Sequence, residues 1–333
     1  MGELRRALAR LPAAAAFAAV LCAPHVLYAQ SFPARPIHVI IPFQPGSTLD
    51  VVGHLTAGKM EEGLGQKVVV EFMGGGNGVV GAQYVARSAP DGYTLLLTTP
   101  SSQITPVYLL RSLPYDPRKD FTPIVANVEP VTCLTVSPAL GVGNLKELIE
   151  LARRSPGKLS FASSGNGSVF HLMGEQVNQV AGIRTVHVPY KNAAQALPDV
   201  SSGQPEMVYS ACNNVRPFAA SGKLKILAQF LPAGFPGRFA RFPDVPSVTE
   251  TLPDYQKPPS WIAYFGPAGV PQAVVSRINA AVVRGLNAPD VRSKLEEAGL
   301  FLIGNTPEQF KSMYQAGFEI YANAVKAAGL KPE

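Results

Sequence analysis

Two segments of the sequence share one pattern, in which an apolar run is followed by a short loop of small polar residues and then by a helix. The first loop, residues 44–48 (QPGST), follows the run 37–43; the second loop, residues 163–168 (SSGNGS), follows the run 158–162 about 120 residues later. A helix that starts after such a loop has unpaired backbone N–H groups, and its dipole favours negative charge there. The two loops therefore predict two anion-binding sites without charged side chains, one in each half of the chain.

Residues 1–29 have the pattern of a secretory signal peptide. A basic start precedes an apolar run at 11–22, and Ala29 ends a suitable cleavage site. The run is too short to span a membrane. Cys22 raises the alternative of a lipoprotein, but Leu21 is not the small residue that usually precedes a lipidated cysteine. We expect a soluble protein that is exported to the periplasm.

Strand-like apolar runs alternate with amphipathic helices along the rest of the chain, which predicts an α/β fold with mostly parallel sheets. The expected strands cover 37–43, 67–72, 93–99, 121–126, 131–136, 158–162, 184–190, 206–210, 223–228 and 260–265. The expected helices cover 49–64, 82–88, 144–154, 169–180, 191–197, 274–286, 289–298 and a last helix from 306. Without its first 29 residues the chain keeps 304 of 333 residues, enough for two domains with a ligand cleft between them.

Composition argues against several functional classes. The formal net charge of +6 falls to about +4 without residues 1–29, and no cluster of Lys and Arg suggests nucleic acid binding. The histidines are scattered and no CxxC pair occurs, so we expect neither a metal nor a cofactor. Cys133 and Cys212 could form a disulfide or remain buried free thiols, and their spacing does not decide between the two.

Two enzyme-like patterns need an explanation. Gly76, Gly78 and Gly81 match the dinucleotide-binding pattern GxGxxG, but they follow the second strand of their unit rather than the first. A close-packed glycine-rich turn explains them better. Ser47, Ser164 and Ser168 could be imagined as nucleophiles of an exported hydrolase, but none lies in GxSxG. His171 is the base candidate near them, and no triad pattern accompanies it.

Eight short segments together resemble the periplasmic substrate-binding proteins of tripartite tricarboxylate transporters. They occur in the family's order and span most of the chain: 36–46 with Asp50, 89–95, 113–117, 156–167, 187–191, 221–224, 242–248 and 267–271. The resemblance implies a type II-like periplasmic-binding-protein fold of two α/β lobes. The first lobe would comprise 30–126 with 230–333, and the second 127–229. Residues 230–259, which show no clear period, would form a long ordered crossing.

The resemblance also implies a function without catalysis. A monomer would capture a small carboxylate by closing its cleft, and would deliver it to the membrane subunits of a transporter. Carried over by position, the expected ligand contacts are Phe43, Gly46, Ser47, Thr48, Ser101, Ser102, Ser164, Gly165, Asn166, Gly167, Ser168, Tyr190 and Ser210. A binding protein that presents its ligand to a signalling receptor is the main alternative, and an exported hydrolase is a weaker one.

The chain departs from the family pattern at positions that bear on the ligand. Ser47, Thr48 and Leu49 stand where the family usually has a glycine run followed by Thr, and Ser210 stands where it often has an Asp. In the family that Asp often recognises an amino or hydroxyl group on the ligand. Leu49 and Phe72 would make the cleft more apolar if they face it. These departures favour an organic acid, with aromatic acids among the candidates, over an amino acid such as aspartate.

Overall fold

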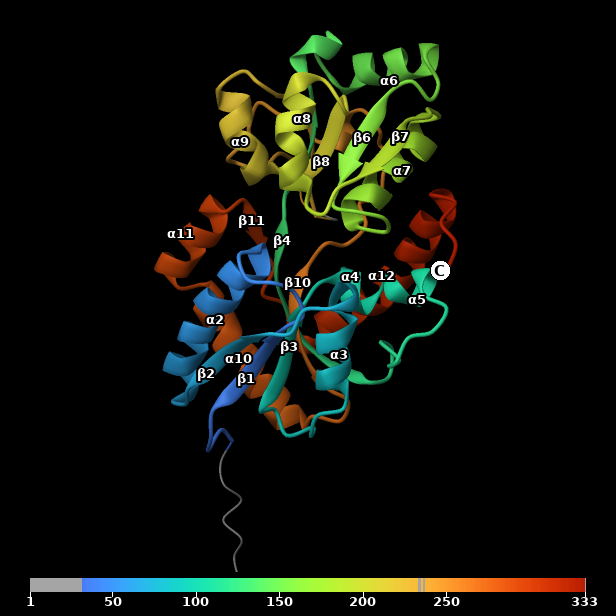
Figure 1. Cartoon of the computed structure of the whole chain (residues 1–333). Coiled ribbons are helices and arrows are strands. Elements are labelled where there is room, and N and C mark those ends of the chain that lie inside the picture. The colour runs from blue at the N-terminus through green and yellow to red at the C-terminus, as the bar shows by residue number, and fades with distance from the viewer. Residues whose placement is uncertain (1–31, 233–234, 236, 333) are drawn as a thin grey trace, which may run out of the picture. The chain divides into compact units, whose positions relative to one another are not determined.

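A six-stranded sheet forms the first of two sheets in the computed structural model, which describes residues 32–232, 235 and 237–332. Its strands lie in the order β11-β4-β10-β3-β1-β2 (Figure 1). They are β1 (Ile37–Ile41), β2 (Val68–Phe72), β3 (Thr94–Thr98), β4 (Phe121–Pro130), β10 (Ile262–Pro267) and β11 (Leu300–Leu302). The predicted signal peptide, residues 1–29, lies outside the described residues.

The second sheet has five strands in the order β7-β6-β8-β5-β9. They are β5 (Thr132–Val136), β6 (Ser160–Ser163), β7 (Val186–Pro189), β8 (Met207–Ala211) and β9 (Lys225–Phe230). We call each sheet with its helices a lobe. The exact division of the chain at 126/127 and 229/230 stays a prediction, and residues 35–333 form one compact unit.

Helices connect most of these strands. They are α2 (Thr48–Leu64), α3 (Val79–Ala86), α4 (Pro100–Gln103), α5 (Pro106–Leu109), α6 (Leu145–Arg154), α7 (Val169–Ala181), α8 (Leu197–Ser202), α9 (Cys212–Ala220), α10 (Gln272–Leu286), α11 (Pro289–Glu297) and α12 (Pro307–Ala327). Short 3₁₀ turns are η1 (Gly76–Gly78), η2 (Pro138–Leu140), η3 (Ala193–Ala196) and η4 (Val248–Glu250). Within the described ranges, no helix is both long and apolar enough to cross a membrane.

The α/β class is confirmed, but the sheets are mixed rather than mostly parallel. Strand β1 runs parallel to β2 and β3, and β6 runs parallel to β7 and β8. In contrast, β10 is antiparallel to β3 and β4, and β5 is antiparallel to β8 and β9. The reason is topological, because the chain enters the second sheet through β4 and β5 and returns through β9 and β10. The sequence analysis also missed the short edge strand β11.

Helices cover both faces of the first sheet because its strands are apolar on both sides. Ile40 and Leu96 belong to a buried cluster with residues of α3 and α12, which also contains Trp261. On the other face, α2 packs so closely at Gly53 that a Cβ there would lie 2.8 Å from Cδ1 of Ile41.

The glycine-rich turn after β2 is a packing device. A Cβ at Gly81 would lie 2.8 Å from the carbonyl oxygen of Met73 and 2.8 Å from Cβ of Pro42. Gly78 has φ of +93°, and a Cβ there would lie 2.7 Å from Cβ of Ser102. These contacts confirm the close-packed turn that the sequence favoured over a dinucleotide site.

A disulfide joins Cys133 on β5 to Cys212 at the start of α9, with the two Cα atoms 5.0 Å apart. The structure thus decides a question that the spacing left open. Both cysteines are buried in one cluster with Phe239 and Phe242, which belong to the segment 230–259. The Gln229 side chain adds hydrogen bonds to this segment: it donates to the carbonyl oxygens of Phe242 and Val245 and accepts from the N–H of Phe239.

A buried ion pair links two segments that pass between the sheets. Glu129 on β4 accepts hydrogen bonds from the Lys257 ammonium and, through the same oxygen, from the Ser260 N–H (3.0 Å) and hydroxyl (2.9 Å). Lys257 also donates to the Ser260 hydroxyl at 2.7 Å. Because Glu129 and Lys257 are both at least nine-tenths buried, each charge requires the other.

We predict that replacing both cysteines, Cys133→Ala with Cys212→Ala, lowers the free energy of unfolding by about 4 kcal/mol. The disulfide closes a loop with a sequence separation of 79, and such a closure reduces the entropy of the unfolded chain by about that amount. Urea unfolding of residues 30–333 with and without the substitutions measures the difference.

A thiol assay checks the bond itself. Residues 30–333 contain no other cysteine. The unfolded, unreduced protein should therefore show no free thiol, and should show two after reduction. Two free thiols before reduction would contradict the disulfide.

Candidate functional site

A cavity of about 400 Å³ lies where the first and second loops come together. Its lining residues are Phe43, Gln44, Pro45, Gly46, Ser47, Thr48, Leu49, Thr99, Pro100, Ser101, Pro130, Ser164, Ser168, Val169, Phe170, Asn192, Ser260, Ile262 and Tyr321. The volume suits a small organic molecule. None of these lining residues carries a formal charge, so an anion would be held by neutral donors.

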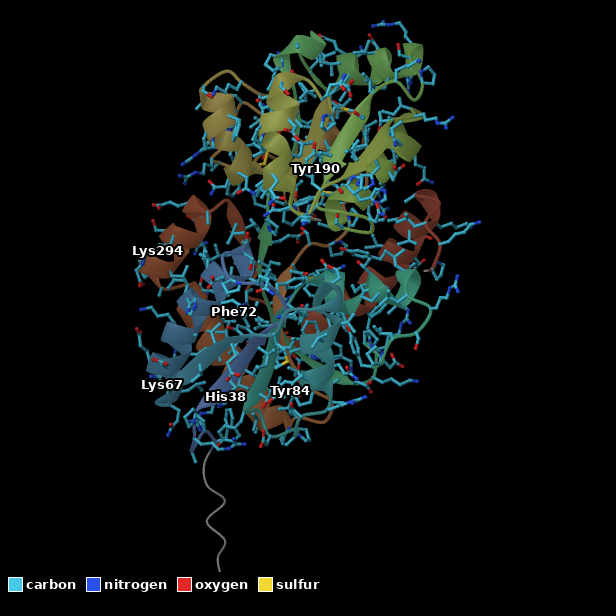
Figure 2. All side chains as sticks on the ribbon, viewed as in Figure 1. His38, Lys67, Phe72, Tyr84, Tyr190 and Lys294 are labelled. Carbon is cyan, nitrogen blue, oxygen red and sulfur yellow. A yellow bond between two sulfur atoms is a disulfide. The ribbon has the colours of Figure 1, made fainter. Side chains whose placement is uncertain are left out.

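Seven of the thirteen predicted contacts line this cavity. They are Phe43, Gly46, Ser47, Thr48, Ser101, Ser164 and Ser168. Leu49 also lines it, whereas Phe72, labelled in Figure 2, does not; its ring lies 6.4 Å from that of His54. The apolar character that we expected from Leu49 is therefore present at the cavity, and that expected from Phe72 is not.

Two of the other predicted contacts have buried side chains. Ser102 is fully buried and shares a hydrogen bond of 2.5 Å with the hydroxyl of Thr98. Ser210 is fully buried on β8, and its hydroxyl has no partner among the described residues. Neither residue lines the cavity.

The four remaining predicted contacts lie beside the cavity rather than in its wall. Tyr190, labelled in Figure 2, donates its hydroxyl proton to Asp199 at 2.8 Å. Asn166 lines a neighbouring depression formed mainly by η1, α5 and the C-terminal residues. Gly165 and Gly167 use their N–H groups inside the second loop. Their roles as ligand contacts stay predictions.

The first loop keeps several hydrogen-bond donors free. Ser47 precedes α2, but its side chain does not cap the helix, and its buried hydroxyl has no partner among the described residues. In the same part of the chain, no hydrogen bond uses the N–H of Ser47 or Thr48. The N–H of Gly46, by contrast, donates to the Asp50 carboxylate at 2.8 Å. The helix start thus offers two amides and one hydroxyl to a ligand.

More hydrogen-bond donors of the second loop are used within the loop and its adjoining helix than we expected from the sequence. The N–H of Gly165 donates to the Ser163 hydroxyl at 3.1 Å, and the N–H of Gly167 donates to Nδ1 of His171 at 3.1 Å. Ser168 caps α7 by accepting from the N–H of His171 at 3.2 Å. Among the described residues, the N–H groups of Ser164 and Asn166 make no hydrogen bond. Ser164, which lines the cavity, is the main free donor of this loop.

A stacked pair of histidines supports the second loop, and no pattern in the sequence predicted this pair. The rings of His171 and His187 are 3.6 Å apart and inclined by 10°. Nε2 of His187 lies 2.6 Å from the Ser163 hydroxyl. Burial lowers the pKa of His187 to about 4; the charge of His171 adds to this effect and Glu175 opposes it. His187 is therefore neutral over most of the pH range in which proteins are stable.

Residues far from either loop complete the cavity, and sequence reasoning did not find them. Pro130 and Ile262 come from the crossing strands, Tyr321 from α12, and Ser260 from the buried network around Glu129. The sequence offers one weak signal for them: in a two-lobed protein, the strands that cross between the lobes are expected at the hinge. Which of their side chains reach the cavity depends on the pairing of β4 with β10.

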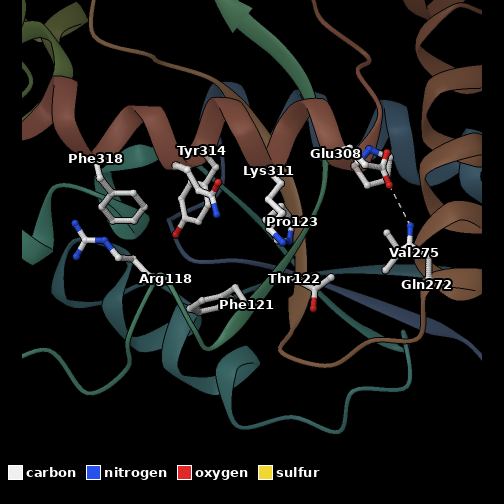
Figure 3. A pocket seen from close by; sticks show the side chains of 12 residues that line it. Arg118, Phe121, Thr122, Pro123, Gln272, Val275, Glu308, Lys311, Tyr314 and Phe318 are labelled. Carbon is white, nitrogen blue, oxygen red and sulfur yellow. Dashed lines mark hydrogen bonds between the residues drawn. The ribbon is translucent and has the colours of Figure 1, made fainter.

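A second cavity of about 440 Å³ lies within the first lobe (Figure 3). It is lined by residues 118, 121–123, 272 and 275 and by several residues of α12, including Lys311 and Phe318. The guanidinium carbon of Arg118 lies 4.1 Å from the centroid of the Phe318 ring. Because a single lobe forms this cavity, closure of one lobe on the other would not change it. The cavity at the two loops is the better candidate for a ligand site.

No group of His, Cys, Asp or Glu side chains in the described ranges could hold a metal ion. The polar groups at the cavity are hydroxyls, amides and backbone N–H groups. Such groups bind and orient a small anion through hydrogen bonds.

Comparisons with known proteins agree with this architecture. Residues 52–330 match the model of the tripartite tricarboxylate transporter family receptor. The UPF0065 protein in the tcbD-tcbE intergenic region of Pseudomonas sp. (strain P51) is 31% identical over 291 residues, which cover 87% of this chain and 85% of that protein.

Two solved structures share the fold. R. palustris Rpa4515 with adipate has a TM-score of 0.78 and 29% identity, and the match covers 91% of this chain and 100% of that one. MatC from Rhodopseudomonas palustris with bound malate has a TM-score of 0.73 and 30% identity, covering 88% and 100%. The chain belongs to the family of tripartite tricarboxylate transporter receptors, which are periplasmic solute-binding proteins.

Proposed function

We propose that this protein captures a small organic carboxylate in the cavity between the first and second loops and delivers it to the membrane subunits of a tripartite tricarboxylate transporter. The observation that carries the proposal is the start of α2, where the N–H groups of Ser47 and Thr48 and the hydroxyl of Ser47 have no partner among the described residues. A carboxylate needs several donors to replace its water, and this helix start supplies them.

The chemistry of the relatives supports a carboxylate as the ligand. The two solved relatives described above hold adipate and malate, which are both dicarboxylates. The cavity of this chain combines free donors with apolar residues such as Phe43, Leu49 and Phe170. A ligand with a carboxylate at one end and an apolar body would place the carboxylate at the free donors and the body against the apolar residues. We also propose that the protein is a monomer and that its signal peptide directs it to the periplasm.

Binding without turnover is the second part of the proposal. Ser163 and His187 lie at hydrogen-bond distance, as a nucleophile and its base would. However, Ser163 is fully buried, and the low pKa of His187 makes it a weak base. A nucleophile must reach its substrate, so the pair lacks the access that a hydrolase requires.

Closure of the lobes is the proposed means of capture. The second loop already approaches the first lobe at Gly167, where a Cβ would lie 2.0 Å from Cδ1 of Leu109 on α5. A ligand that contacts both loops would favour the conformation in which they lie close together, and it can shift that balance only by its preference for this form.

We predict that a dicarboxylate such as adipate or malate raises the thermal midpoint of residues 30–333. A ligand that binds only the folded protein adds about 2.7 kcal/mol of stability at a hundred times its dissociation constant. A thermal-shift panel of mono-, di- and tricarboxylates, aromatic acids and acidic amino acids tests this. If no acid shifts the midpoint, the carboxylate proposal fails.

We predict that Ser47→Ala and Ser164→Ala each weaken binding of the best acid from this panel about fivefold, because each removes one hydrogen bond to the ligand. Isothermal titration measures the change. Ser202→Ala, at the exposed end of α8, serves as the control and should bind as the wild type does. Unchanged affinity in both cavity variants would place the ligand elsewhere.

We predict that Gly167→Ala weakens ligand binding about tenfold or more, because its methyl group would displace Leu109 and hold the lobes apart. Gly182→Ala is the matched control: both glycines have positive φ, +69° and +62°, but nothing lies within 4 Å of a Cβ at Gly182. Both variants should lose about 1 kcal/mol of stability from backbone strain. Equal ligand affinity in the two would contradict the role of the Gly167 contact.

A further inference from the structure

The stacked pair His171–His187 holds both ends of the second loop. At one end, Nε2 of His187 lies 2.6 Å from the hydroxyl of Ser163. At the other, Nδ1 of His171 accepts the N–H of Gly167 at 3.1 Å. The two rings contact each other at 3.6 Å, so the loop and the pair form one connected unit. Neither ring lines the cavity, but Ser164, between the two anchored ends, does.

The donor at Gly167 fixes the state of His171. A backbone N–H can only donate, so Nδ1 of His171 must carry no proton in this arrangement. The ring proton then lies on Nε2, which faces Glu175 at 3.8 Å. A second proton on His171 would turn Nδ1 from an acceptor into a donor that opposes the Gly167 N–H.

The surroundings of the pair disfavour charge on His187. Phe161 on β6 packs against both rings, and its ring also contacts that of Tyr209 on β8. Burial raises the pKa of Tyr209, which is therefore neutral. Glu175 is the one charged group that faces the pair in the described structure. Two imidazolium rings stacked at 3.6 Å would repel each other, and a single carboxylate would compensate only one of them.

We propose that His171 and His187 are positioning residues for the ligand: His171, as the acceptor of the Gly167 N–H, and His187, as the hydrogen-bond partner of the Ser163 hydroxyl, fix the second loop in the conformation that leaves Ser164 free to bind. This inference rests on the proposed function, because it assigns the pair a task at the same cavity. It goes further in predicting that two side chains without ligand contact, the buried His171 and the half-buried His187, control the affinity, and that they do so through the hydrogen bonds of their ring nitrogens rather than through their bulk.

Paired substitutions separate the effect of the hydrogen bonds made by His171 and His187 from the effect of their packing. In His171→Asn the side-chain oxygen takes the place of Nδ1, and in His187→Gln the side-chain oxygen reaches about as far as Nε2; neither new side chain titrates. His171→Leu and His187→Leu keep most of the volume but remove the hydrogen-bonding nitrogen. With adipate as the probe at about pH 7, we expect each Leu variant to bind about tenfold more weakly, and the Asn and Gln variants to stay within about twofold of wild type.

His38→Asn is the control for replacing a histidine elsewhere. His38 lies on β1, is partly exposed and pairs with Glu71. The substitution His38→Asn should therefore leave the affinity for adipate unchanged. If the Leu variants bind as tightly as wild type, or if the Asn and Gln variants bind as weakly as the Leu variants, the proposed role of the histidine hydrogen bonds is wrong. Circular dichroism identifies a variant that does not fold. If a Leu variant does not fold, the affinities of the Asn and Gln variants still test the role of the histidine hydrogen bonds.

The pH dependence supplies a readout that a purely structural role would not move. Because the pKa of His187 is lowered in the folded protein, the unfolded chain binds more protons between about pH 6.5 and pH 4, so the folded protein loses stability as the pH falls through this window. Relative to the double variant His171→Asn with His187→Gln, wild-type affinity should fall about twofold at pH 4 and further below it. Protonation of adipate affects both proteins equally and cancels.

A ligand-free measurement distinguishes failure of this inference from failure of the proposed function. In ¹⁵N NMR spectra of the wild type, the Gly167 amide signal should shift with the same midpoint as an imidazole of the pair. If adipate does not bind but the amide follows the imidazole, the proposed ligand is wrong and the positioning role stands. If adipate binds and the amide is independent of both rings, the positioning role is overturned alone.

Discussion

The buried carboxylate of Glu129 is the interaction on which the arrangement of the two lobes depends. It sits on β4, which leads into the second sheet, and it bonds to Lys257 and Ser260 on the segment that leads back. Removing one partner would leave a buried charge uncompensated, which is far more costly than losing an exposed ion pair. Ser260 also lines the ligand cavity. The network therefore fixes the crossing segments and part of the cavity wall together, while its opposite charges add no net charge beside the ligand.

Neutrality is a consistent property of the cavity. Its wall has hydroxyls, amides and apolar side chains, and the charged groups nearby are engaged: Asp50 accepts from Gly46, and Glu129 is paired with Lys257. An anion held by backbone N–H groups and hydroxyls can be released by opening the lobes, because no strong ion pair has to be broken. This chemistry suits a carrier that must give up its ligand to a membrane partner.

The two loops serve the cavity in different ways, although their sequences are alike. The first loop leaves its amides free because Ser47 does not cap its own helix. The second loop is internally bonded because Ser168 caps α7 and Gly167 donates to His171. One loop thus supplies most of the donors, and the other is a rigid wall whose conformation depends on the histidine pair. Such a rigid wall reduces the ordering cost of binding.

The sequence by itself determined the α/β class, most helices and strands, and the two loops, because hydrophobic periodicity and helix-start residues are local signals. The predicted contacts came from the family resemblance, and seven of the thirteen line the cavity. The antiparallel crossing strands, the Cys133–Cys212 disulfide and the His171–His187 stack were decided by tertiary structure. Each joins residues far apart in the chain, and only the order and register of the strands bring them together. The burial of Ser102 in α4 and of Ser210 on β8 likewise depends on packing against residues distant in the chain, which local sequence signals do not encode.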